Sequence, residues 1–147
     1  MGLIAALAPG AVAVDTVGFI YFIEEHARFA RVIAPLFEAV DRGERRIVTS
    51  ALTLLEVLVV PYRVGDFSLA ERYEALLTRS RGLELIELDR GQLRSAAALR
   101  AVYGVRTPDA FQLAAALSAD CGSLVTNDRE LPELPGLKVV QIADFAD

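Results

Sequence analysis

The stretch AVAVDTVGFI, residues 11–20, decides the fold, because a short apolar run ends at an acid and a helical pattern follows at once. Residues 11–14 have the length and composition of a buried strand. Further short apolar runs predict strands at 46–49, 83–88, 123–126 and 137–142. Strands that alternate with helices in this way predict an α/β fold with a central, mainly parallel sheet.

The segments between these strands have helical patterns. Helices are expected over 17–25, 27–41, 51–60, 68–79, 89–103 and 107–121. Pro35 is expected to kink or interrupt the second of these helices, and Pro61 is expected to end the third. The triplet Thr107-Pro108-Asp109 predicts a helix start, because threonine caps helices, proline suits the first helical position and an acid suits the positive end of the dipole.

The composition predicts one folded domain over residues 1–147, with residues 1–10 expected to be flexible. Hydrophobic residues make up 54% of the chain and charged residues 24%, which excludes a disordered protein. Cys121 is the only cysteine, so no internal disulfide can form, and this fits a cytoplasmic protein. The formal net charge of −5 argues against a broad basic surface for nucleic acid, although a bound cation and a few arginines would suffice for RNA.

The apolar segment Leu3–Ile23 is long enough to imitate a membrane span. Three features argue against that interpretation. Asp15 lies in the middle, where a charge is expensive in hydrocarbon, and Pro9 and Gly10 break the run. No Lys or Arg precedes the segment, as a signal peptide would require. We therefore expect no membrane partner.

Four acidic residues stand in unusual places, and two of them follow buried strands. Asp15 closes the strand of residues 11–14, and Asp128 comes just after the strand of residues 123–126. The carboxyl edge of an α/β sheet is where ligands bind. The alternatives are that Asp15 caps the next helix and that Asp128 forms a turn. Asp109 stands in the first turn of its helix, where an acid is also ordinary dipole chemistry.

Glu56 is the most telling of the four acids. It lies inside the segment of residues 51–60, which is apolar on every side of a helix and is therefore expected to be mostly buried. An unpaired buried carboxylate costs several kcal/mol, so Glu56 needs a cation, a partner or a proton. An ion pair with a distant arginine is the alternative to a functional role, and we favour the functional role.

Acids gathered in one pocket need a cation. Two carboxylates about 4 Å apart repel by roughly 4 kcal/mol at an effective dielectric constant near 20. His26 is the only histidine, so a metal would have to be held by carboxylates, which suit Mg²⁺ or Mn²⁺. Such a site can activate a water and stabilise the charge that develops on a phosphodiester. The acids therefore predict a metal-dependent nuclease.

Four segments resemble the motifs of the PIN-domain family, in the family's order. They are VAVDT at 12–16, TSALTLLEV at 49–57, RTPDAFQLA at 106–114 and LVTNDREL at 124–131. The resemblance extends from Val12 to about Ile142. One departure is Val17-Gly18, where many members have a polar residue. Within the family, the chain resembles the VapC-type toxins of toxin–antitoxin pairs.

The resemblance implies a PIN-like, three-layer α/β/α fold and an endoribonuclease that depends on Mg²⁺ or Mn²⁺. It also implies a homodimer and a small antitoxin protein that blocks the pocket. The acids of the metal pocket, which would also be the catalytic residues, would be Asp15, Glu56, Asp109 and Asp128. Thr16, Thr126 and Asn127 would support them by positioning water or a carboxylate. Arg106 and Arg129 flank the expected pocket and would either hold RNA phosphate or pair with its acids.

Three other functions compete with this interpretation. A phosphoacceptor receiver domain would need a lysine near the pocket, but Lys138 falls late, inside the last strand. A haloacid-dehalogenase-type phosphatase would need a second Asp two residues after the first, where this chain has Val17. The third is a non-catalytic PIN-like module that only binds another protein, and the sequence leaves that alternative open.

Overall fold

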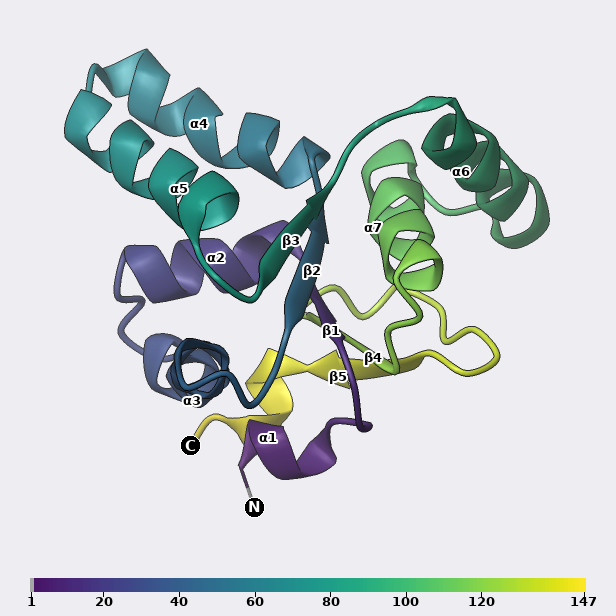
Figure 1. Cartoon of the computed structure of the whole chain (residues 1–147), viewed down its shortest axis with the longest axis horizontal. Helices are drawn as coiled ribbons and strands as arrows, with labels where there is room; N and C mark the ends of the chain where they lie inside the picture. The colour runs from purple at the N-terminus through teal and green to yellow at the C-terminus, as the bar shows by residue number, and fades with distance from the viewer. Residues whose placement is uncertain (1) are drawn as a thin grey trace.

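The computed structural model describes residues 2–147 and is built on one five-stranded sheet (Figure 1). The strands are β1 (Val12–Val14), β2 (Ile47–Ser50), β3 (Leu83–Ile86), β4 (Ser123–Thr126) and β5 (Lys138–Gln141). Their order across the sheet is β3-β2-β1-β4-β5, and every neighbouring pair is parallel. The predicted parallel α/β sheet is confirmed, with β1 and β4 side by side at its centre.

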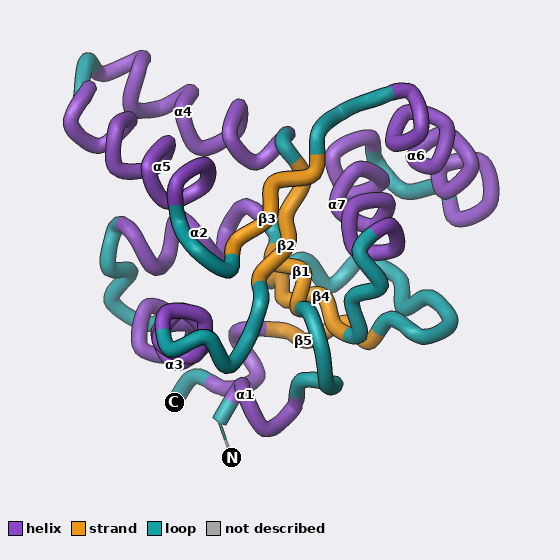
Figure 2. Tube along the Cα trace, viewed as in Figure 1, coloured by secondary structure: helices purple, strands orange, loops and turns teal. Residues whose placement is uncertain are grey.

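Helices cover both faces of the sheet. They are α1 (Leu3–Ala6), α2 (Thr16–Ile23), α3 (Ala30–Asp41), α4 (Leu52–Val64), α5 (Phe67–Arg79), α6 (Arg90–Tyr103), α7 (Thr107–Ser118) and the 3₁₀ helix η1 (Ile142–Phe145). Figures 1 and 2 show α6 and α7 on one side of the sheet and α2 to α5 on the other. The three-layer prediction is therefore confirmed.

Alternation along β1 explains why there are two cores. Val12 and Val14 face the core formed with α2, α3 and α5, whereas Ala13 faces the core formed with α6 and α7. Side chains on successive strand residues point to opposite faces, so a central strand must be apolar at every position. This is why the short run VAV of β1 has no polar residue until Asp15.

Residues 2–10, which belong to the start expected to be flexible, contact the rest of the domain in the structure. Helix α1 packs against α3, and Leu3 and Leu7 are both buried. The backbone N–H of Ala8 donates to the hydroxyl of Ser123 over 2.8 Å. The anchoring could not be predicted from the sequence, because α1 has four residues and is too short to show a helical period. Met1 lies outside the described residues.

Two prolines were expected to disturb helices, and both lie inside continuous ones. Pro35 is within α3 and Pro61 within α4, which continues to Val64 and ends where Gly65 adopts a left-handed φ of 73°. A proline removes one backbone hydrogen bond from a helix interior. Both helices bury residues before their proline and at or after it, and this packing offsets the loss. Within residues 2–147, no helix combines the length and apolar character that a membrane crossing requires.

Candidate active site

A cleft of about 570 Å³ lies at the carboxyl ends of β1 and β4. All four acids singled out from the sequence line it: Asp15, Glu56, Asp109 and Asp128. Thr16, Asn127 and Arg106 line it too, as do Tyr21 and Glu130. Parallel strands bring their carboxyl ends to one edge, so acids more than 100 residues apart in the sequence meet here.

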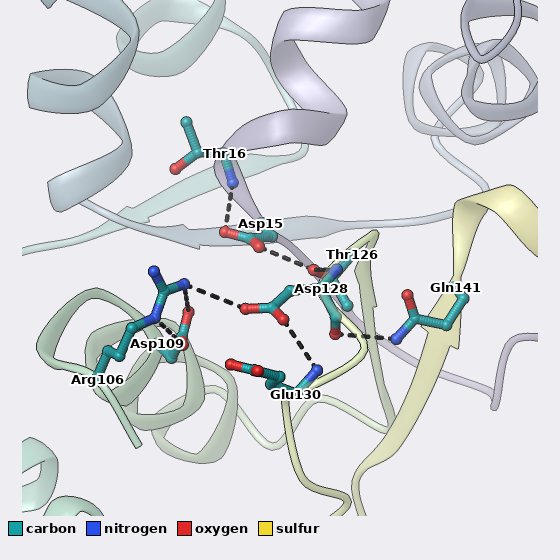
Figure 3. A network of polar contacts seen from close by, with 8 residues as sticks. All are labelled: Asp15, Thr16, Arg106, Asp109, Thr126, Asp128, Glu130 and Gln141. Carbon is teal, nitrogen blue, oxygen red and sulfur yellow. Dashed lines mark hydrogen bonds and ion pairs between the residues drawn. The ribbon is translucent and has the colours of Figure 1, made fainter.

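Asp15 takes the capping role that the sequence offered as an alternative, and it also lines the cleft. It caps α2, since its Oδ1 accepts the backbone N–H of Thr16 over 2.8 Å, and its Oδ2 accepts the Thr126 hydroxyl over 2.8 Å (Figure 3). Burial raises the pKa of Asp15; these two hydrogen bonds oppose the rise, and the nearby charges of Asp109 and Glu56 add to it. Asp15 forms no ion pair with any residue in 2–147, so its charge is not compensated.

Glu56 reaches the cleft from α4. Its Oε1 accepts the hydroxyl of Thr16 over 2.6 Å, and no arginine of the described chain pairs with it. The expected burial of this helix on all sides is wrong, because α4 leaves the sheet and forms a projecting pair with α5 (Figure 1). Leu55, for example, is 60% exposed. Glu56 itself is only partly buried.

Asp109 and Asp128 share one arginine. Arg106 Nε lies 3.1 Å from Asp109 Oδ2, and Arg106 Nη2 lies 3.2 Å from Asp128 Oδ2 (Figure 3). Asp109 is 7% exposed, and its position in the first turn of α7 is as predicted. The predicted cap is wrong by one residue, since Arg106 takes the cap position of α7 and Thr107 begins the helix.

The loop after β4 is held by hydrogen bonds to the Asp128 peptide and side chain. Thr126 Oγ1 accepts the N–H of Asp128 over 3.0 Å, so one hydroxyl contacts both Asp15 and the Asp128 loop. Gln141 of β5 donates to the Asp128 carbonyl over 3.0 Å. The N–H of Glu130 donates to Asp128 Oδ1 over 2.9 Å, and Glu130 is a fifth acid at the cleft that the sequence analysis missed.

Of the remaining predicted residues, Asn127 lines the cleft and Arg129 lies outside it. Asn127 supports the site, because its amide nitrogen donates to the Tyr21 hydroxyl over 3.2 Å and its oxygen accepts the N–H of Ala143 over 2.8 Å. Arg129 does not line the cleft; it pairs with Asp144 of η1 at 2.5 Å. Gly18 is explained by packing, since a Cβ there would lie 2.5 Å from a side-chain carbon of Val14.

Three buried polar residues below the cleft were also missed. Thr49, Thr53 and Gln112 are all fully or almost fully buried, and their side chains bond to one another. The available signal was Gln112 itself, a long amide in the otherwise apolar run of α7. A buried amide needs hydrogen-bond partners, so its presence predicts a polar network.

A larger hollow of about 820 Å³ lies near the amino ends of the strands, beside residues 9–11, 40–46 and 81–82. Several arginines line it, but three of them are already engaged. Arg42 pairs with Glu44, Arg46 pairs with Glu84, and Arg45 donates to the backbone carbonyls of residues 8 and 10. The cleft at the other edge holds the uncompensated charge and is the better candidate.

The donor set of the cleft suits a hard divalent cation, because it offers carboxylate and hydroxyl oxygens. As the side chains of residues 2–147 stand, no three Asp, Glu, His or Cys groups converge closely enough to hold an ion. Asp109 and Asp128 are turned to Arg106, whereas Asp15 and Glu56 have only hydroxyl or backbone partners. The donor atoms are therefore of the kind that such an ion takes, and Arg106 engages two of the four acids in this structure.

Comparisons with known proteins agree with this architecture. A chain of a toxin–antitoxin complex from Klebsiella pneumoniae superposes with a TM-score of 0.64 and 22% identity, over 86% of this chain and 94% of the other. A chain of VapBC2 from Rickettsia felis, bound to a promoter DNA fragment, gives 0.63 and 18% over 93% and 99%. A chain of VapBC-5 from Mycobacterium tuberculosis gives 0.53 and 21% over 90% and 99%.

At these identities, the likeness to the solved structures shows a shared fold. A search of curated protein sequences finds no significant match. The model of the PIN domain family, however, matches residues 12–137, which include all four acids of the cleft. The chain therefore belongs to the PIN domain family.

Proposed function

We propose that this PIN-domain protein is a metal-dependent endoribonuclease that hydrolyses RNA phosphodiester bonds and is the toxin of a type II toxin–antitoxin pair. The observation that carries the proposal is the meeting of four acids in one cleft, where Asp15 and Glu56 have no cationic partner among residues 2–147. Uncompensated carboxylates in a partly buried site favour a bound cation. Mg²⁺ or Mn²⁺ is the cation that this oxygen donor set suits.

Asp15, Asp109, Asp128 and Glu56 are the residues that would hold the ion. When bound, the ion supplies an activated water and stabilises charge on the phosphodiester. Thr126 orients Asp15 and restrains the Asp128 loop. Glu56 Oε1 accepts the hydroxyl of Thr16, so Glu56 Oε2 would be the oxygen that contacts the ion or takes a proton from the attacking water.

Arg106 is the residue of the cleft best suited to an RNA phosphate. Its guanidinium presents a planar fork of donors that matches phosphate oxygens. The side chain is 69% exposed, so it can turn toward a substrate without disturbing the core. The chain's net charge of −5 is compatible with this role, because a metal ion and one arginine supply positive charge where the scissile phosphate would lie.

We also propose a small antitoxin as a protein partner, a homodimer as the oligomeric state and the cytoplasm as the location. The solved structures of similar fold include toxin–antitoxin complexes. The projecting α4–α5 pair exposes large apolar side chains that a helix of the antitoxin could cover; they are Leu55, Val59, Val60, Tyr62, Val64 and Phe67. Such a patch on a soluble domain favours a protein partner. Light scattering of the purified chain tests the dimer, and co-expression with the product of any small gene beside this one tests the antitoxin.

The decisive experiment is incubation of the purified chain with mixed RNA in Mg²⁺, in Mn²⁺ and in chelator. We expect cleavage with either metal and none with chelator. Asp15→Asn serves as the matched inactive variant, because asparagine caps a helix as well as aspartate does. Equal cleavage by the parent and by this variant would mean that the activity comes from a contaminant.

The alternative is a non-catalytic PIN-like protein-interaction module. The observation that favours it is the Arg106 contact, which engages two of the four acids without any metal. A Mn²⁺ titration by calorimetry separates the two functions. The module should bind no Mn²⁺ in a manner that depends on Asp15 or Asp109, whereas the nuclease should lose its binding in either Asn variant.

A further inference from the structure

Below the cleft, a row of buried polar side chains connects the helices that hold its acids. Gln112 of α7 and Thr53 of α4 are 2% and 0% exposed. Gln112 Nε2 donates to Thr53 Oγ1 over 2.8 Å, and Thr53 Oγ1 lies 3.2 Å from Thr16 Oγ1. Thr16 then donates to Glu56 Oε1 over 2.6 Å. We call Gln112, Thr53 and Thr16 the buried polar chain.

The directions of these hydrogen bonds follow from the donors and acceptors at each end. Gln112 Oε1 accepts the backbone N–H of Ser50 over 3.3 Å, and because that group can only donate, the amide nitrogen must face Thr53. At the other end, Thr16 donates its hydroxyl proton to Glu56 Oε1. Thr53 is therefore the donor in its contact with Thr16.

Thr49 stabilises the middle of the row. Its hydroxyl donates to the carbonyl of Val14 over 2.8 Å, and its oxygen lies 2.8 Å from Thr53 Oγ1. The proton of Thr53 is thus shared between the oxygens of Thr49 and Thr16. Because Val14 is the residue before Asp15, this contact connects the row to the end of β1.

Each member of the buried polar chain lies within one helical turn of an acid of the cleft. The pairs are Asp109 with Gln112, Glu56 with Thr53, and Asp15 with Thr16. Buried amides and hydroxyls give little net stability compared with apolar groups of the same shape. Packing alone would therefore be served equally well by apolar side chains at these positions. What the polar row adds is hydrogen bonds that fix the orientation of the side chains at its two ends.

We propose that Gln112 and Thr53 are positioning residues that act through Thr16 to set the orientation of the Glu56 carboxylate relative to Asp15. The inference rests on the proposed function, since it assigns roles in the same cleft. Residues behind metal ligands typically change metal affinity or activity by about 10- to 100-fold when their hydrogen bonds are removed. Gln112 and Thr53 are candidates for an effect at the lower end of that range, because Thr16 stands between them and the acid.

The test uses two variants that remove one hydrogen-bonding group and keep the volume, and a third that keeps the hydroxyl. Thr53→Val removes the hydroxyl, Gln112→Met removes the amide, and Thr53→Ser retains the hydroxyl. We expect the Kd for Mn²⁺, measured by calorimetry, to rise about 10-fold in the first two variants. Thr53→Ser should bind Mn²⁺ like the parent, because it keeps the hydroxyl. If packing rather than the hydroxyl mattered, Thr53→Ser would also weaken binding, because serine lacks the methyl group of threonine.

Ser123→Ala is the matched control. Ser123 is fully buried, and its hydroxyl accepts a hydrogen bond from the N–H of Ala8, but it lies at the opposite end of β4 from the cleft. Its replacement should lower the melting temperature without changing Mn²⁺ affinity. A comparable change of affinity in this control would mean that the effect is general destabilisation.

A crystal structure of Thr53→Val gives a readout that needs no metal. We expect the Glu56 carboxylate to leave the position it has beside Thr16. Parent-like Mn²⁺ affinity together with an unmoved Glu56 would overturn the inference and leave the proposed function intact. A parent that binds no Mn²⁺ would overturn the proposed function, and the position of Glu56 would then decide the inference alone. Should Thr53→Val not fold, Gln112→Met takes its place in both measurements.

Discussion

Arg106 Nη2 lies 3.2 Å from Asp128 Oδ2, although 22 residues separate the two in the sequence. The same guanidinium contacts Asp109, so its positive charge lies between the negative charges of two acids. The hydrogen bond and charge of Asp109, together with the charge of Asp128, raise the pKa of the Arg106 guanidinium and keep it charged. A metal ion that enters the cleft must therefore compete with an arginine of the same chain.

Replacing Arg106 should strengthen metal binding and weaken RNA binding. In Arg106→Gln the two acids lose their competitor, so we expect the Kd for Mn²⁺ to fall by roughly two- to fivefold, the range for an exposed ion pair. The Kd for a non-cleavable RNA should rise, because a phosphate contact is lost. Arg129→Gln is the control, since Arg129 pairs with Asp144 outside the cleft. Weaker Mn²⁺ binding in Arg106→Gln would contradict the competition.

Replacing Asp15 should abolish cleavage without harming the fold. Asn at this position can still cap α2 through its oxygen, and its amide nitrogen can donate to the Thr126 hydroxyl oxygen in place of the bond that Asp15 accepts, so the local structure is retained. The buried charge is removed, and in chelator we expect the melting temperature to rise by about 2–4 °C, the shift that roughly 1 kcal/mol produces in a chain of this size. Cleavage assays and thermal melts of the same preparation measure both effects. A marked fall of the melting temperature would indicate a structural role instead.

The raised pKa of Asp15 also predicts how stability depends on pH without metal. A carboxyl group whose pKa is raised by folding stabilises the native state below its unfolded pKa, and this stabilisation is lost as pH rises through the folded pKa. The stability advantage of Asp15→Asn over the parent should therefore grow as pH increases from about 4 to 7 in chelator. Melts of both proteins across this range give the difference directly. An advantage that is constant with pH would mean that Asp15 does not titrate in this window.

Cys121 should be unreactive in the native protein. Burial raises the pKa of its thiol to about 11, so almost no thiolate is present at pH 8. Alkylation followed by mass spectrometry should be slow in native buffer and fast in denaturant. Because the unfolded thiol ionises near pH 9, stability should also fall as pH rises from there toward 11. Rapid labelling of native protein at pH 8 would show that the end of α7 opens readily.

The anchoring of α1 gives a prediction for stability. Leu7 is buried, so Leu7→Ala should reduce the free energy of unfolding by about 2–3 kcal/mol. Ala5 is exposed on the same short helix, and Ala5→Ser should change it by less than about 0.5 kcal/mol. Denaturant unfolding measures both values. Equal stability of Leu7→Ala and the parent would restore the idea of a flexible start.

The sequence predicted best those features that depend on strand ends. Asp15 and Asp128 could be placed together because each follows a buried strand, and parallel strands end at one edge. Pairing with acids of the pocket was one of the two roles expected for Arg106, but which acids it contacts could not be predicted, since the conformation of an exposed arginine depends on neighbours distant in sequence. The predicted helix end at Pro61 was wrong for a related reason. Tertiary packing on α4 outweighs the local helix-breaking preference of proline.

The burial of Glu56 shows a different limit. Its helix is apolar all round, which predicts a core helix when only the sequence is considered. In the structure, the apolar residues of α4 are divided between buried positions such as Val57 and an exposed face that includes Val60, 56% exposed. Composition measures how much apolar surface a helix has, but it does not say whether the chain itself covers that surface.

The projecting α4–α5 pair has a mechanical consequence. Glu56 lies near the root of this arm, whereas the exposed apolar side chains lie along it toward the turn at Gly65. If a partner bound the exposed residues near Gly65 and tilted the α4–α5 pair about the start of α4, the distance between Glu56 and Asp15 would change. A partner bound outside the cleft would thus change the positions of the acids inside it.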